Sequence, residues 1–106
     1  MVVRDLLEMR RKGQREAVTA IIRMVRDLKE HGRESRYALP LKGTPVWELK
    51  TRSRGGEKGG ARVYFFWTQD GVPTLCGAEV KEGDTPSAGL LKEALRAALG
   101  NRKGET

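Results

Sequence analysis

The apolar residues change their spacing near residue 40, and this change constrains the fold more than any other feature of the chain. In residues 14–31 they recur at helical spacing and form one stripe, which consists of Ala17, Val18, Ile21, Ile22, Val25 and Leu28. In residues 44–53 they alternate with polar residues, as they do along a half-buried strand. The chain must therefore combine helices with a sheet.

Three helices are predicted. Residues 2–12 form a short amphipathic helix, and residues 14–31 form a stronger one that Gly32 can terminate. The last helix has Thr85 as its N-cap, Pro86 at its first position and Gly100 just past its end. Its apolar face contains Leu90, Leu91, Ala94, Leu95, Ala98 and Leu99. Residues 101–106 are expected to form a flexible tail.

Three strands are predicted, at 44–53, 61–69 and 73–80, and Asp70-Gly71 marks the second hairpin turn. On the first strand, Trp47 and Leu49 share one face, and Glu48, Lys50 and Arg52 share the other. On the second, Val63, Phe65 and Trp67 oppose Arg62, Tyr64 and Phe66.

The predicted order of elements indicates an α+β fold with two N-terminal helices, a three-strand antiparallel meander and a C-terminal helix. We expect one domain over residues 1–100. The helices should cover one face of the sheet and leave the other open to a ligand.

Charge points to a class of partner. The net charge is +7, and residues 1–62 hold sixteen lysines and arginines against eight acidic residues. Such a field favours polyanions, of which nucleic acid is the commonest in a cytoplasm. The alternative is a soluble protein that is merely basic.

Cysteine and apolar content suggest the compartment. Cys76 is the single cysteine, so no intramolecular disulfide forms and a reducing cytoplasm is expected. No apolar run approaches the length of a membrane span, and the first residues do not read as a signal peptide. We expect a cytoplasmic protein with no membrane partner.

The sequence lacks the residues that several kinds of binding site require. One His and one Cys do not make a zinc site, and the sequence has no P-loop and no G-x-G-x-x-G motif after a strand. We expect no metal and no cofactor. His31 lies at a helix end, where a structural role is favoured over a catalytic one.

The candidate site is a set of cations on the strands. If the strands are neighbours, their charged ends can meet in one hollow; the set consists of Lys50, Arg52, Arg62 and Lys81. Such a hollow suits RNA cleavage, in which the ribose 2′-OH attacks and the protein aligns the phosphate and stabilises the phosphorane. The alternative is that these cations only solubilise an exposed face.

Further RNA contacts are possible beside this set. Tyr64 can stack on a base, although a packing role is the alternative. The glycine-rich loop "RGGEKGGAR" at 54–62 carries Arg54 and Lys58, which can touch RNA or belong to a solvated hairpin tip.

Three segments together resemble the RelE/ParE toxin superfamily, and in particular its phage-derived HigB-like branch: "LKGTPVWELKTRS", "ARVYFFWTQDGVPTLCGAEVKEGDTP" and the final helix. The family pattern "L-x-G-x-L-W-E-L-R" is matched at Leu41, Gly43, Trp47, Glu48 and Leu49. The "Y-R-V-x-Y-F" pattern is matched at Arg62, Val63 and Phe65, and the third strand at Gly77, Lys81, Thr85 and Pro86. The resemblance covers about residues 5–99.

The resemblance implies the toxin of a toxin–antitoxin pair. RelE- and HigB-like members are endoribonucleases that cleave messenger RNA on the ribosome without a metal, and a small helix-turn-helix antitoxin silences them. The basic active-site positions of the family fall on Lys50, Arg52, Arg62 and Lys81, and Glu48 is implied to be structural. ParE-like members instead poison gyrase, so a non-catalytic binding protein is the alternative.

Two departures bear on catalysis. Lys50 stands where the family pattern has arginine, which keeps the charge but loses the bidentate fork. Glu82 and Asp84 stand where cations are expected.

Overall fold

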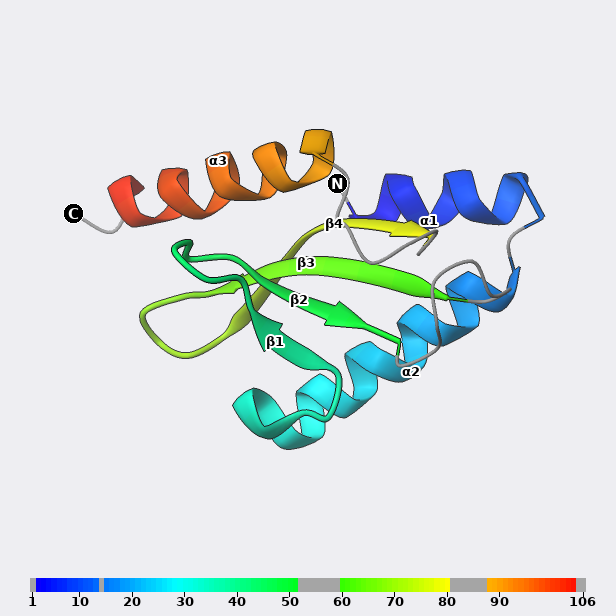
Figure 1. The fold of residues 1–106 in the computed structure, drawn as a ribbon, viewed down its shortest axis with the longest axis horizontal. Helices are drawn as coiled ribbons and strands as arrows, with labels where there is room; N and C mark the ends of the chain where they lie inside the picture. Colours follow the sequence, from blue (N-terminus) through cyan, green and yellow to red (C-terminus); the bar gives the residue numbers. More distant parts are fainter. Residues whose placement is uncertain (1, 14, 52–59, 81–87, 105–106) are drawn as a thin grey trace.

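The fold is built from three helices and four strands (Figure 1). The computed structural model describes residues 2–13, 15–51, 60–80 and 88–104. Helices α1 (Val2–Arg11) and α2 (Arg15–His31) precede the short 3-10 helix η1 (Gly32–Glu34). The strands are β1 (Ala38–Pro40), β2 (Trp47–Lys50), β3 (Ala61–Trp67) and β4 (Pro73–Val80), and α3 (Ala88–Gly104) follows them. The α+β class is confirmed.

The sheet is antiparallel, with the strand order β1-β2-β3-β4, so the predicted three-strand meander was wrong by one strand. The missed strand, β1, has three residues and includes a proline, which gives it almost no signal of its own. It is a strand because it pairs with β2: Leu41 N–H donates to the Val46 carbonyl at 3.0 Å. The hairpin turn places Gly43 at φ +78°, a conformation that favours glycine.

Each outer edge of the sheet has a backbone donor that is already occupied. On β1, Ala38 donates its N–H to the Ser35 carbonyl at 3.2 Å, and Pro40 has no N–H. On β4, Ala78 donates its N–H to Oδ2 of Asp5, which α1 carries, at 3.0 Å. These contacts oppose the pairing of another strand at Ala38, Pro40 and Ala78.

One face of the sheet packs against α1 and α2. Val63 and Phe65 of β3 are fully buried there, in one cluster with Ile21, Met24 and Leu28 of α2. The alternation predicted for β3 is confirmed, because Tyr64 and Phe66 belong to a different cluster.

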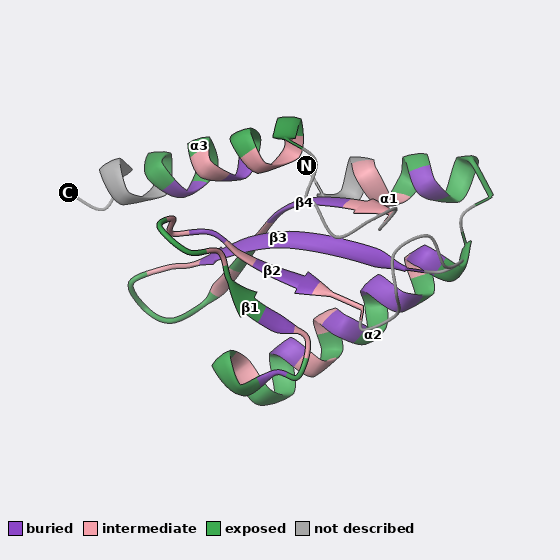
Figure 2. Ribbon diagram, viewed as in Figure 1, coloured by how far each residue is buried: buried purple, intermediate pink, exposed green. Residues whose placement is uncertain are grey.

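Helix α3 covers the β3 and β4 part of the opposite face, so the expectation of an open face was wrong. Tyr64, Phe66 and Cys76 on the sheet share a buried cluster with Ala94 and Ala98 of α3. Figure 2 shows β3 buried along most of its length, between α3 on one side and α2 on the other. The sheet is the middle layer of a sandwich.

The 3-10 helix η1 is anchored to the sheet through an aromatic cluster. The guanidinium of Arg33 lies 4.5 Å from the ring centroid of Trp67 and 5.7 Å from that of Trp47. Phe65 completes the cluster, with its ring 5.4 Å from that of Trp67. Cation–π contacts of this kind hold the connection between α2 and β1 against the sheet.

The helix ends differ from the prediction in one case. Gly32 follows α2 at φ +58°, which confirms it as the terminating residue. Helix α3, in contrast, is described over Ala88–Gly104 and continues through Gly100, so the predicted end at Gly100 was wrong. Thr85 and Pro86 lie outside the described residues. Ile22 was placed in the core stripe of α2 but is 47% exposed.

Candidate functional site

Three strands bring a charged cluster together on the α3 side of the sheet. The register aligns Lys50 of β2 with Arg62 of β3, and Arg62 with Glu79 of β4. Two residues further along each strand, Glu48 of β2 is aligned with Tyr64 of β3. Because residues two apart share a face of a strand, these five side chains lie on one side of the sheet. We call them the charged cluster.

The centre of the charged cluster is a buried ion pair. Arg62 donates from Nη1 to Oε2 of Glu48 at 2.9 Å, and the two side chains are 1% and 5% exposed. Transfer of the two charged groups from water to the interior costs roughly several kcal/mol per ion. The attraction between them in a well-aligned hydrogen-bonded pair offsets that cost. The ion pair between Arg62 and Glu48 therefore joins β3 to β2 inside the protein.

Tyr64 forms the second buried contact of the cluster. Its hydroxyl donates to Oε2 of Glu79 at 2.7 Å. Burial raises the pKa of Tyr64 well above its usual value, and the hydrogen bond to Glu79 and the charge of Glu79 raise it further. The hydroxyl is thus held as a proton donor to Glu79, and its ring is packed against the core under α3.

Lys50 is the accessible cation of the charged cluster. Its Nζ lies 3.9 Å from Oε1 of Glu48, and its side chain is 32% exposed. Glu48 therefore contacts Lys50 with one carboxylate oxygen and Arg62 with the other. The buried ion pair therefore lies beside a lysine whose side chain is partly exposed.

The structure brings together part of the predicted site. Lys50 and Arg62 are neighbours, as the alternation predicted, but Arg62 and Tyr64 are buried and present no surface to a substrate. The other predicted positions lie outside the described residues; they are Arg52, Arg54, Lys58 and Lys81.

Glu79 is the member of the charged cluster that sequence reasoning missed. It contacts Tyr64, and its strand position is opposite Arg62. The signal that could have found it is its place in the alternation of β4, two residues after Gly77. Using that signal requires the register between β3 and β4, which shifts by one residue between Tyr64 and Phe65. A strand bulge of this kind has no clear mark in the sequence.

Metal-binding clusters and membrane-spanning helices are both absent from the described residues. No group of three or more His, Cys, Asp or Glu residues is placed to hold a metal ion in the part of the chain that the structure describes. Among the described helices, none has both the length and the apolar character needed to cross a membrane.

Comparison with known proteins adds no relative. No family model matches the chain, and neither a curated protein nor a solved structure matches it.

Proposed function

We propose that this chain is the toxin of a type II toxin–antitoxin pair, with a RelE/HigB-like fold, and that it cleaves messenger RNA on the ribosome without a metal. The observation that carries the proposal is the position of Lys50, an accessible ammonium group beside the buried Glu48–Arg62 ion pair. The resemblance of the strand motifs and the net charge of +7 support an RNA target. A cognate helix-turn-helix antitoxin and a cytoplasmic location belong to the same proposal.

In the proposed reaction the RNA substrate supplies its own nucleophile, the ribose 2′-OH. The ribose 2′-OH attacks the adjacent phosphorus and loses its proton to water as the O2′–P bond of a 2′,3′-cyclic phosphate forms. The P–O5′ bond breaks, and the 5′-oxygen leaves with a proton from water. Negative charge develops on the phosphorane oxygens, and Lys50 is placed to stabilise that charge. Arg62 acts through Glu48 as a positioning residue, because the carboxylate it holds also contacts Lys50.

Induced expression in a bacterial host, with growth and transcript integrity followed together, tests this proposal. The wild-type chain should arrest growth and leave cut transcripts. Lys50→Ala should lower the cleavage rate by about a hundredfold, since one charge-stabilising donor is lost. Lys50→Arg keeps the charge and should retain cleavage.

Lys92→Ala is the matched control, because Lys92 is an exposed lysine of α3 outside the charged cluster. It should remain as toxic as the wild type. If Lys50→Ala cleaves transcripts as fast as the wild type does, the proposed role of this site is wrong.

A second candidate is a non-catalytic binding protein of the same fold, directed at gyrase or at another partner. It is favoured by the observation that Arg62 and Tyr64 already contact the carboxylates of Glu48 and Glu79. Two predicted RNA-binding groups are thus engaged within the protein. Growth arrest with intact transcripts would support this candidate, and inhibition of supercoiling by purified gyrase would identify the gyrase-directed case.

A further inference from the structure

A groove of about 500 Å³ lies on the outer surface of α2, against the segment that leads into β1. Arg23 and Arg26 of α2 line it, and Arg36 and Tyr37 face them from the segment. Its volume is within the range of small-ligand sites, roughly 300–1,000 Å³. The charged cluster lies on the α3 side of the sheet, whereas α2 covers the other side (Figure 1). The groove is therefore separate from the site proposed for cleavage.

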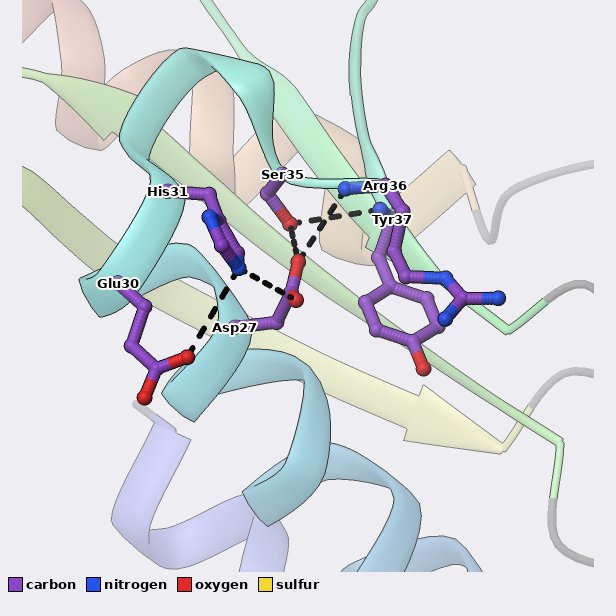
Figure 3. Close-up of polar contacts among 6 residues, drawn as sticks. All are labelled: Asp27, Glu30, His31, Ser35, Arg36 and Tyr37. Atoms are coloured by element: carbon purple, nitrogen blue, oxygen red, sulfur yellow. Dashed lines mark hydrogen bonds and ion pairs between the residues drawn. The ribbon is translucent and has the colours of Figure 1, made fainter.

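The far wall of the groove is fixed to α2 by Asp27 (Figure 3). Oδ2 of Asp27 accepts hydrogen bonds from Ser35 Oγ at 2.6 Å and from the Arg36 N–H at 3.2 Å. The Asp27 Oδ1 atom lies 3.6 Å from His31 Nε2, and the Asp27 side chain is only 18% exposed. The Asp27 carboxylate is thus occupied by contacts within the protein, and these contacts fix the positions of Arg36 and Tyr37 relative to α2.

The open charges of the groove are mainly positive. Arg23 and Arg26 are exposed and one helical turn apart, and neither forms an ion pair within the described residues. Arg36 is exposed on the opposite wall. Glu30, 76% exposed and 3.8 Å from His31, is the groove's other carboxylate. Three guanidinium groups thus face one solvated carboxylate, which favours an anionic ligand.

The groove also carries a flat platform. The guanidinium of Arg36 lies over the ring of Tyr37, 5.5 Å from its centroid, and the half-buried Tyr37 packs against the core. Bases of single-stranded nucleic acid stack on planes of this kind, on arginine as well as on aromatic rings. Ile22 adds an exposed apolar contact. The aspartate and glutamate side chains of an acidic peptide would use the charges but have no ring to stack on the platform.

We propose that this groove binds single-stranded nucleic acid, with phosphates on Arg23 and Arg26 and a base stacked on Arg36. This site goes beyond the proposed cleavage function, and it would give the protein a second contact with nucleic acid on the side of the sheet opposite Lys50.

Fluorescence anisotropy tests the proposal with the full chain and a labelled 2′-O-methyl oligouridylate of about twelve nucleotides. The methyl group blocks the cleavage nucleophile, so binding is measured whether or not the protein is a nuclease. The double variant Arg23→Ala/Arg26→Ala should bind at least about tenfold more weakly and lower the slope of log K against log salt by roughly 1.4. Arg36→Lys keeps the charge but loses the plane, and should bind roughly threefold to tenfold more weakly.

The matched control is Lys92→Ala/Arg96→Ala, which removes the same charge from exposed positions of α3. It should leave the salt slope close to that of the wild type. Equal weakening by the two double variants would overturn the proposal, because it would indicate only a general electrostatic effect. Wild-type binding by Arg36→Lys, or tighter binding of a polyglutamate peptide than of the oligonucleotide, would overturn it as well. If the wild-type chain binds the oligonucleotide in the groove but does not cleave transcripts, that result counts against the proposed function and leaves the groove proposal standing.

Discussion

At the scale of single residues, the charged cluster shows where the fold places an arginine and a tyrosine that were predicted to contact RNA. Arg62 and Tyr64 lie on the face that the alternation assigned to them. Each is buried, however, and each contacts a carboxylate on the neighbouring strand. A buried charge or hydroxyl needs such a partner, so their burial and their contacts have one physical cause.

Tyr64→Phe should change the response of stability to alkaline pH. The pKa of Tyr64 is raised in the folded state by burial and by Glu79, while an unfolded tyrosine titrates near about 10. The folded state therefore retains a proton that the unfolded state loses, and the free energy of unfolding falls as pH rises above about 10. The wild type should show a steeper fall than Tyr64→Phe, by up to about 1.4 kcal/mol per pH unit.

Urea unfolding at a series of pH values from neutral to strongly alkaline measures this difference. Cys76 also lowers the free energy of unfolding at alkaline pH in both proteins, because burial raises the pKa of its thiol to about 11. The contribution of Cys76 therefore cancels in the comparison. If the free energy of unfolding falls equally steeply with alkaline pH in the wild type and in Tyr64→Phe, Tyr64 is not the source of this pH dependence.

At the scale of elements, α1 is attached to the sheet through one carboxylate. Asp5 accepts the N–H of Ala78 on the outer edge of β4 at 3.0 Å, although the two residues are far apart in the sequence. Met9 of the same helix is buried in the core cluster beside Ala78. The helix therefore satisfies an edge donor and covers apolar surface at once.

Asp5→Ala should destabilise the fold by about 1–3 kcal/mol, because the Ala78 N–H loses its acceptor in a buried setting. Asp5→Asn keeps a carbonyl oxygen and should cost less. Glu8→Ala on the same helix is the control: its contacts with Arg11 and Lys12 are exposed and should contribute little to stability. Chemical denaturation compares the three variants, and equal losses for Asp5→Ala and Glu8→Ala would contradict the attachment.

At the scale of the whole molecule, the sandwich depends on small residues in α3. Ala94 and Ala98 are buried against the sheet, in the cluster that contains Tyr64 and Phe66. They are four residues apart and so lie on one side of the helix. Small side chains at these positions let α3 approach the sheet closely and form the third layer.

Ala94→Leu should therefore loosen the cover that α3 gives the sheet. Overpacking of a filled core costs about 1–3 kcal/mol, and we expect a loss of stability in that range. Ala97→Leu makes the same change at an exposed position of α3 and should leave stability within about 0.5 kcal/mol of the wild type. Thermal and urea unfolding of the pair measures the contrast, and equal stability of the two variants would contradict the packing described here.

The sequence by itself determined the type and order of most elements and the faces of β2 and β3. These follow from local periodicity, which the backbone geometry of helices and strands imposes on any chain. It also placed Lys50 and Arg62 on one face of neighbouring strands, as the register shows.

Only the tertiary structure decided the fourth strand, the cover of the second face by α3 and the partners of the buried groups. The three residues of β1 become a strand through pairing with β2, and the contact between Arg62 and Glu48 depends on register and depth. The groove on α2 depends on Asp27 holding Arg36 in place across a turn of chain. Long-range pairing and burial are properties of the assembled layers, and no local pattern encodes them.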